Sequence, residues 1–378
     1  MAGKRPMTLR LITRGSEMMV ARMWPFQDVM AARPDVGYTV HLLGEYGGDL
    51  EQLRSRAYVK RRLPVRRADD EVWLLRGWNK PNLVAAAYAA RARRIPLMLW
   101  HEPPGRTWEA STISQAARIR VRKLLLPQTF RAYRGCVLLG IGELAARRFA
   151  ELAPGSHVHV LPYPDHQADE LLSRGGAEPE VAEPDIAEPD VAEPEVAERA
   201  VPRLLFVGEF SPRKGVDLLA AACEDLWREG ARFELRYVGG GPSEQLLREH
   251  ASRSGGRAEV LGALRGDALL DLFGSCDGFV LPSRWDGWGL VVHEALAAGL
   301  PVVVSDACGA KMLVGDCGVV FGAGDPGGLA RGLRWCISLT RRERDAIRSQ
   351  GREAAAAITM DRIGDALVAH AREALALA

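Results

Sequence analysis

The chain contains only six cysteines in 378 residues, and none of them lies in a CxxC or CxxH spacing. Disulfide frameworks and cysteine-based zinc sites depend on such spacings, so we interpret the cysteines as reduced and mostly buried thiols. No uninterrupted apolar run approaches the roughly 18 residues that cross a bilayer, and the N-terminus lacks the apolar core of a secretory signal. These absences predict a cytoplasmic protein without a transmembrane segment.

Lysine is also scarce, with six residues among the 50 lysines and arginines, and the formal net charge is only +2. Residues 177–198 hold nine acids and no lysine or arginine, so the positive charge lies on the rest of the chain. This distribution favours phosphate-bearing small substrates, and no stretch predicts nucleic-acid binding.

The acidic stretch is a repeat, AEPEV, AEPDI, AEPDV, AEPEV, over residues 177–196. Its regular prolines oppose helix and sheet, and its acids repel one another, which predicts an extended or disordered segment. We interpret it as an expanded surface loop between two domains, in preference to a docking tail.

On both sides of this loop, short apolar strands alternate with helical patterns, which is typical of parallel sheets covered by helices on both faces. The eleven predicted strands are 9–13, 37–43, 71–75, 96–100, 136–140 and 157–161 before the loop, and 203–207, 233–238, 258–261, 278–281 and 301–304 after it. The fold class is therefore α/β, with two Rossmann-like domains of doubly wound parallel sheet. We place an N-terminal domain at 1–172, the linker at 173–200, a second domain at 201–358 and a C-terminal helix, crossing back to the first domain, at 359–378. Ligands of such sheets bind beyond the carboxyl ends of the strands.

Residues 281–305, LPSRWDGWGLVVHEALAAGLPVVVS, are the most informative part of the chain. They predict a strand, a helix from about Trp288 to Ala298 and a second strand, with Asp286 at the N-cap of the helix. The flanking glycines allow backbone amides to approach a phosphate or sugar hydroxyl closely. Glu294 lies eight residues on, roughly 12 Å along a helix, which suits opposite ends of an elongated polar ligand.

This stretch resembles the E-x7-E motif of retaining glycosyltransferases of family 4, which have the GT-B fold of two Rossmann-like domains facing a cleft. Asp286 stands at the position of the first Glu and Trp288 at that of the aromatic residue, while Glu294 and Gly299 match. The resemblance implies that Asp286 contacts the transferred sugar and Glu294 the ribose of a nucleoside diphosphate sugar. It also implies donor contacts by Gly287, Trp288, Gly289 and Leu290.

A second loop, GEFSPRKG at 208–215, follows an apolar strand and precedes an amphipathic helix. A cation and free helix amides converge there, which favours an anion. The loop resembles the family's VGR-xxxx-KG, whose Arg and Lys neutralise the leaving diphosphate. Lys214 matches the Lys, but Glu209 occupies the Arg position, so either Arg213 substitutes or Lys214 and the backbone act alone.

Further loops after strands complete the predicted donor site. Gly240 and Gly241 resemble the family's G-x-GP turn beneath the nucleotide, and Gly262 to Leu264 match the loop whose backbone reads the base. A base that is recognised by backbone atoms cannot be identified from the side chains in the sequence. The nucleobase is therefore left open, with UDP or GDP favoured as the nucleotide.

The first half carries weaker signals. His101 and Glu102 end a strand ahead of a proline-rich loop, where family members often carry a His that contacts the donor sugar. Gly15, Ser16 and Glu17 follow the first strand, where many relatives have a Gly-Gly pair near the diphosphate and acceptor. We assign these residues to the acceptor side.

The catalytic prediction rests on His101, Asp286 and Lys214, with no metal and no cofactor besides the nucleotide sugar as co-substrate. A DxD pair, which holds a divalent metal in sugar transferases of the other major fold, does not occur in the sequence. The resemblance implies retention at the anomeric carbon, and no side chain stands out as a covalent nucleophile.

We expect a small-molecule acceptor, in preference to a membrane lipid reached through the basic pattern at 114–126. Three alternatives stay open: a nucleotide-sugar epimerase, a hydrolase, and a non-catalytic nucleotide-sugar-binding homologue. A dinucleotide oxidoreductase is disfavoured because no GxGxxG follows the first strand of either half. The oligomeric state is left open.

Overall fold

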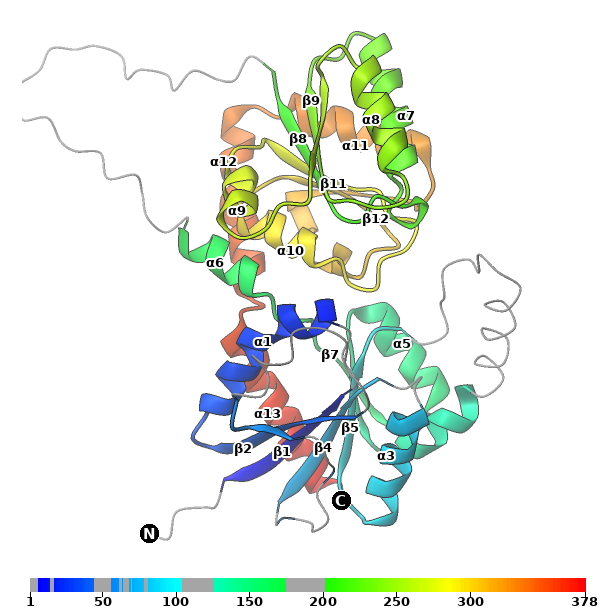
Figure 1. Cartoon of the computed structure of the whole chain (residues 1–378), viewed down its shortest axis with the longest axis vertical. Coiled ribbons are helices and arrows are strands. Elements are labelled where there is room, and N and C mark those ends of the chain that lie inside the picture. The colour runs from blue at the N-terminus through cyan, green and yellow to red at the C-terminus, as the bar shows by residue number, and fades with distance from the viewer. Residues whose placement is uncertain are drawn as a thin grey trace, which may run out of the picture. The chain divides into compact units, whose positions relative to one another are not determined.

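The computed structural model describes residues 6–13, 17–43, 56–60, 63, 68, 70–77, 81–103, 126–174 and 201–378, with the backbone alone for 17–23. The chain divides into two compact units (Figure 1), Met1–His166 with Ile358–Ala378, and Gln167–Ala357. The division at His166 lies a few residues before the boundary predicted at 172. Among the described residues no helix is both long and apolar enough to span a membrane. The acidic repeat and the basic pattern at 114–126 lie outside the described residues.

Unit 1 is built on a parallel sheet of seven strands in the order β3-β2-β1-β4-β5-β6-β7. The strands are β1 (Met7–Thr13), β2 (Val36–Leu42), β3 (Val59–Lys60), β4 (Glu71–Arg76), β5 (Leu97–His101), β6 (Val137–Gly140) and β7 (His157–Val160). The strand order reverses between β1 and β4, so the topological switch point of this sheet lies at their carboxyl ends.

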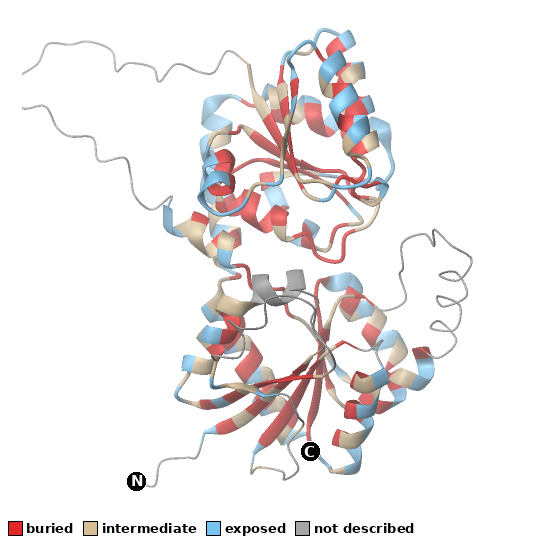
Figure 2. Cartoon of the chain, viewed as in Figure 1, coloured by how far each residue is buried: buried red, intermediate tan, exposed pale blue. Residues whose placement is uncertain are grey.

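Helices cover both faces of this sheet because its central strands β4, β5 and β6 are buried almost throughout, on both sides. They are α1 (Glu17–Ala32), α3 (Pro81–Ala92), the 3-10 turn η1 (Arg131–Tyr133), α5 (Glu143–Leu152) and α13 (Met360–Ala376). One core cluster joins α3 and α5 to the sheet through residues such as Trp73, Leu83 and Phe149. Helix α13 contacts α1 and strands β4 to β6, and Figure 2 shows the buried residues concentrated on the strands and inner helix faces.

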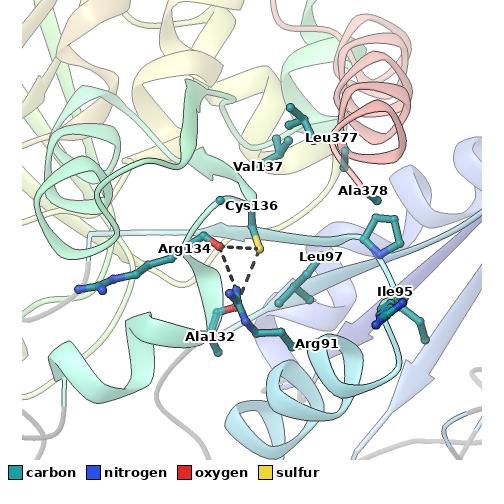
Figure 3. A pocket seen from close by; sticks show the side chains of 13 residues that line it. Arg91, Ile95, Leu97, Ala132, Arg134, Cys136, Val137, Leu377 and Ala378 are labelled. Atoms are coloured by element: carbon teal, nitrogen blue, oxygen red, sulfur yellow. Dashed lines mark hydrogen bonds between the residues drawn. The ribbon is translucent and has the colours of Figure 1, made fainter.

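A pocket of about 330 Å³ lies at the amino ends of β5 and β6, beside the end of α13 (Figure 3). Its lining includes Arg91, Cys136 and Leu377. The Arg91 guanidinium donates to the backbone carbonyls of Ala132 and Arg134 at 3.4 and 3.0 Å, so this cation is engaged by the fold. The pocket is at the edge of the sheet opposite to the carboxyl ends, where ligands of parallel sheets bind.

Unit 2 has a parallel sheet of six strands in the order β10-β9-β8-β11-β12-β13, the doubly wound order of a Rossmann domain. The strands are β8 (Arg203–Val207), β9 (Glu234–Val238), β10 (Ala258–Gly262), β11 (Gly278–Leu281), β12 (Val302–Ser305) and β13 (Gly318–Phe321). The switch point lies between β8 and β11.

Ten helices and turns belong to the described part of unit 2. They are α6 (His166–Arg174), η2 (Pro212–Lys214), α7 (Val216–Arg228), α8 (Glu244–Arg253), α9 (Asp267–Gly274), α10 (Leu290–Ala297), η3 (Gly309–Leu313), η4 (Gly315–Cys317), α11 (Pro326–Ser338) and α12 (Arg341–Ala356). Helix α7 packs with α8 and α11, and α10 packs with α12. Arg352 of α12 donates to the carbonyl oxygens of Leu171 and Ala297, which ties the carboxyl ends of α6 and α10 together.

The structure confirms the α/β class and adds two strands that the pattern did not predict. Strand β3 has only two residues, and β13 reads GVVF, a short apolar run that follows the turns η3 and η4 instead of a helix. All six cysteines are free, and five are buried, in agreement with the prediction of reduced thiols.

Candidate active site

Two loops meet at the switch point of unit 2, the 208–215 loop after β8 and the 282–289 loop after β11. They are joined by the backbone N–H of Arg284, which donates to the carbonyl of Arg213 at 2.8 Å. Gly215 adopts a positive φ of 70°, and a Cβ atom there would lie 2.1 Å from the carbonyl oxygen of Pro282. Glycine is therefore required for the two loops to approach this closely.

An ion pair reinforces this junction. The Arg284 guanidinium donates to both carboxylate oxygens of Asp217 in α7, at 2.6 and 2.7 Å. The same guanidinium donates to the carbonyl of Pro212 at 2.7 Å. Arg284 holds the pKa of Asp217 below its usual range through this hydrogen bonding. Sequence reasoning missed this pair, since Arg284 lies just before the E-x7-E positions and Asp217 just after the 208–215 loop.

Lys214 and Asp286, predicted from separate motifs, form one ion pair. The Nζ atom of Lys214 lies 2.5 Å from a carboxylate oxygen of Asp286, and each side chain is only 11% exposed. The Asp286 backbone N–H donates to Ala307 at 3.1 Å, and the residue bridges to Cys308 as in a strand. A cation and a carboxylate are thus fixed beside each other, nearly enclosed, at the switch point.

The N-cap prediction for Asp286 was wrong. Helix α10 begins at Leu290, and its N-cap is Gly289, which has a φ of 89° and supplies no side-chain cap. Because residues 286–289 form a loop, the helical rise used to separate Asp286 from Glu294 applies only from Leu290 onwards. The Val292 N–H donates to the N-cap carbonyl of Gly289 at 2.9 Å, and the amides of Leu290 and Val291 have no acceptor within the helix. The predicted anion-attracting end therefore remains.

Glu209, which stands at the family's Arg position, is neutralised locally. One of its carboxylate oxygens accepts from the Arg213 guanidinium at 3.1 Å and from the Ser211 hydroxyl at 3.0 Å. Arg213 also donates to the carbonyl of Trp285 at 3.2 Å. Arg213 therefore compensates the carboxylate beside it, and Lys214 is the more enclosed cation of this loop.

Glu294 lies on α10 and is completely buried, as is its neighbour His293. This excludes a solvent-facing role for Glu294. His293 Nε2 lies 3.0 Å from the carbonyl of Ala355, and burial lowers the pKa of His293. Trp288 is also buried, and its backbone carbonyl accepts from Ala310 at 2.7 Å, which fixes the loop ahead of α10.

The glycine-rich turn after β9 packs directly on the 208–215 loop. The Phe210 backbone N–H donates to Gly240 at 2.9 Å, and a Cβ atom on Gly241 would lie 2.7 Å from the Phe210 carbonyl oxygen. Gly262 ends β10 with a φ of 74° and accepts from the Gly239 N–H at 2.8 Å. Leu264 follows and is half-buried. These residues lie at the carboxyl ends of neighbouring strands, as expected.

In unit 1 the structure describes only some of the residues predicted for the acceptor side. Gly15 and Ser16 lie outside the described residues, and Glu17 begins α1 with its side chain outside them. His101 is the last residue of β5, and its Nδ1 lies 3.1 Å from the backbone carbonyl of Glu102. Burial, with a smaller contribution from Arg76, lowers the pKa of His101 to about 4, so this imidazole is neutral at pH 7.

Arg76 is a candidate residue that sequence reasoning missed. It ends β4, next to the switch point of unit 1, and its guanidinium lies over the rings of Trp100 and Tyr163, 5.3 and 4.8 Å from their centroids. The stacking holds a half-buried cation at the carboxyl edge of the sheet. An arginine closing the apolar run EVWLLR was the available signal.

The depressed pKa of His101 predicts an acid-sensitive unit 1. The unfolded chain binds a proton near pH 6.5 that the folded chain takes up only near pH 4, so this stabilisation is present above pH 6.5 and is lost as the pH falls toward 4. Between pH 7 and pH 5 the free energy of unfolding of the wild type should fall by about 1 kcal/mol more than that of His101→Gln, a value reduced for the partial exposure of the His101 side chain. Urea unfolding of both chains at pH 7 and pH 5 measures these free energies. Equal decreases in the two chains would contradict the prediction.

Residues 201–338 match the family model of glycosyl transferases group 1. The chain carries a group 1 glycosyltransferase domain. It is 31% identical over 157 residues to the sulfoquinovosyl transferase SQD2 of Arabidopsis thaliana, covering 40% of this chain and 29% of that protein. It is 35% identical over 155 residues to D-inositol 3-phosphate glycosyltransferase 2 of Catenulispora acidiphila, covering 38% and 36%. The chain spans about a third of the length of these relatives.

Solved structures similar to the whole chain extend the comparison beyond the glycosyltransferase domain. HepE of Anabaena, solved in complex with UDP, has a TM-score of 0.64 at 17% identity, covering 96% of this chain and 98% of its own. Sucrose-phosphate synthase of Thermosynechococcus elongatus has a TM-score of 0.63 at 15% identity, covering 98% and 100%. The predicted GT-B fold is confirmed.

Proposed function

We propose that this protein is a glycosyltransferase that moves a sugar from a nucleoside diphosphate sugar to a small-molecule acceptor. The observation that carries the proposal is the enclosed Lys214–Asp286 pair at the switch point of a group 1 glycosyltransferase domain. A nucleotide is the ligand class that such a switch point accommodates. HepE, solved with UDP, supports a uridine or similar nucleotide as the donor carrier.

Lys214 is proposed to neutralise the departing diphosphate. Its ammonium has three donors, and the bond to Asp286 uses one, which leaves N–H groups for phosphate oxygens. The first-turn amides of α10 and α7 add positive potential at the same edge of the sheet. Charge developing on the leaving group is then stabilised by preorganised donors, without a catalytic metal ion.

Asp286 and Glu294 are proposed to hold the two ends of the donor. Asp286, held in place by its contact with Lys214, accepts hydrogen bonds from hydroxyls of the transferred sugar. Glu294, on the buried face of α10, accepts from the ribose once donor binding opens a path to it. Transfer would retain the anomeric configuration by front-face attack, as the resemblance to family 4 implies.

The acceptor is proposed to bind at the carboxyl edge of the unit 1 sheet, near Arg76 and His101. A stacked guanidinium suits an anionic group, and a neutral imidazole can hydrogen-bond a hydroxyl without repelling the cation. One relative is named for D-inositol 3-phosphate, a phosphorylated cyclitol. A small polyhydroxylated acceptor that carries a phosphate or carboxylate therefore fits best.

Thermal stabilisation by a panel of UDP, GDP, ADP, dTDP and their sugars tests the proposal first. A ligand that binds only the folded state raises Tm, by an amount that grows with its concentration above Kd. We expect one nucleotide class to raise Tm selectively. The matching sugar nucleotide should then release the nucleoside diphosphate only when an acceptor is present.

The same assay separates the alternatives. Turnover of the donor without an acceptor would favour an epimerase or hydrolase. Donor binding without turnover, against phosphorylated and neutral polyol acceptors alike, would favour a non-catalytic homologue. A panel in which no nucleotide raises Tm would contradict the donor site itself.

A further inference from the structure

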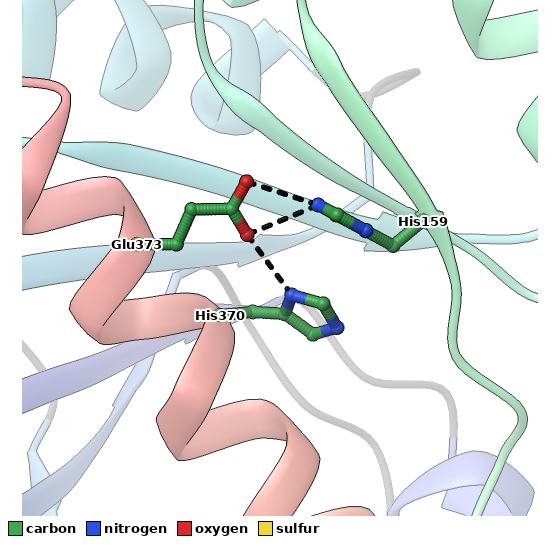
Figure 4. Close-up of side chains that lie close together, drawn as sticks. All are labelled: His159, His370 and Glu373. Atoms are coloured by element: carbon green, nitrogen blue, oxygen red, sulfur yellow. Dashed lines mark hydrogen bonds and ion pairs between the residues drawn. The ribbon is translucent and has the colours of Figure 1, made fainter.

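Three side chains from distant parts of the chain meet in unit 1, His159 of β7 with His370 and Glu373 of α13 (Figure 4). His159 Nε2 lies 3.0 Å from one carboxylate oxygen of Glu373 and 3.1 Å from the other. His370 Nδ1 lies 3.2 Å from a Glu373 oxygen. All three ligand atoms lie within 4.8 Å of one another.

These separations match those of a metal coordination shell. Zinc bonds of about 2.0 to 2.2 Å to nitrogen and oxygen in a tetrahedron place the ligand atoms roughly 3.3 Å apart. The observed nitrogen-to-oxygen distances differ from that value by only a few tenths of an ångström. A metal ion could therefore enter with small side-chain rotations.

The backbone holds the three side chains in this arrangement. His370 and Glu373 are three residues apart on one helix and so project from the same face. His157 and His159 are two residues apart on β7 and lie on one face of the strand. His157 Nδ1 is 3.3 Å from a Glu373 oxygen, so a further imidazole of the same strand lies beside the group of three, within reach after a side-chain rotation.

We propose that His159, His370 and Glu373, with His157 as a fourth ligand, form a structural Zn²⁺ site that links α13 to the edge strand β7. Imidazole nitrogens with one carboxylate suit Zn²⁺, whereas Mg²⁺ and Ca²⁺ require mostly oxygen ligands. The side chains of His159, His370 and Glu373 are 36%, 19% and 29% exposed, so an ion can reach them from solvent.

The site is separate from the proposed chemistry. His157 is the first residue of β7, and Glu373 lies one residue before Ala374, which lines the pocket at the amino ends of β5 and β6. The proposed donor residues lie in unit 2, and the proposed acceptor residues end β4 and β5, whereas the metal ligands belong to β7 and α13. His159 is in register with Trp100, which precedes His101, and β6 lies between the two strands. The metal would therefore stabilise the attachment of α13 to the sheet and take no part in sugar transfer.

The test uses the full-length chain with any affinity tag removed, stripped with EDTA and then titrated with ZnCl₂ by calorimetry. We expect one Zn²⁺ per chain and a higher Tm. His159→Ala and His370→Ala should each weaken Zn²⁺ binding by at least about a hundred-fold, more than the loss of a supporting group usually costs. His166→Ala, which removes an exposed imidazole outside the cluster, should leave affinity unchanged.

A second measurement does not depend on folded variants. The wild-type chain loaded with Co²⁺ should show the intense visible d–d absorption of a tetrahedral site, and added Zn²⁺ should abolish it. Weak octahedral absorption, no bound Zn²⁺ in the wild type, or unchanged binding in the folded double variant His159→Ala with His370→Ala would overturn the proposal. Because the readouts are metal content, spectrum and Tm, the result is independent of whether the chain transfers sugars.

Discussion

Lys214→Ala is expected to lower kcat/KM for the nucleoside diphosphate sugar by at least about ten-fold, the order expected for the loss of one charge-assisted contact. It should also lower the free energy of unfolding by about 3 to 5 kcal/mol. The second effect arises because Asp286, whose side chain is 11% exposed, would be left as an uncompensated charge. Steady-state kinetics and urea unfolding of the same preparation measure both.

A double variant separates the two effects. Lys214→Met combined with Asp286→Asn removes both charges, and replacing a buried ion pair as a whole is often close to neutral for stability. We expect near wild-type unfolding in this variant, with donor use still reduced at least ten-fold. Recovery of turnover together with stability would show that Lys214 acts only through folding.

Gly215→Ala should be among the most damaging of the small substitutions in unit 2. The new Cβ would lie 2.1 Å from the Pro282 carbonyl oxygen, on a residue with a φ of 70°. Strain and overlap together should lower the free energy of unfolding by about 2 to 4 kcal/mol. Separation of the two loops should also reduce the rise in Tm that the cognate nucleotide produces.

Gly230→Ala is the matched control. Gly230 has a φ of 93°, and nothing lies within 4 Å of the position that a Cβ atom would take there, so alanine meets the backbone strain without the overlap. Its cost should be about 1 kcal/mol, with the nucleotide effect intact. Equal decreases in the free energy of unfolding of the two variants would mean that the contact between the two loops at Gly215 contributes nothing to stability.

The fold was predictable because the same sequence pattern recurs along the chain. Each buried strand is a short apolar run followed by a helical pattern, and eleven such runs placed two parallel sheets with ends mostly within one or two residues of the observed ones. Strand β13 was missed although its sequence, GVVF, is as apolar as that of β11. Only the short turns η3 and η4 separate it from β12, so the alternation of strand and helix fails there.

The candidate site was predictable only as separate motifs. Lys214 and Asp286 are 72 residues apart, and nothing local in either loop indicates that their charges meet. The N-cap assignment of Asp286 failed because the close approach of Gly287 to Gly309 draws this segment into a loop, and a left-handed Gly289 begins the helix. His159 and His370 belong to no motif in the sequence, and only the return of α13 to the sheet brings them together.

The return of α13 to the sheet of unit 1 also affects the order in which the two units fold during synthesis. Unit 2 is one uninterrupted stretch, whereas unit 1 lacks the helix that covers β4 to β6 until residues beyond 357 have been synthesised. Domains usually fold in the order in which they leave the ribosome. Here we expect the inverse order: the second half can reach its native state while the first still exposes an apolar sheet face, so the nascent N-terminal half should be the form most prone to aggregate.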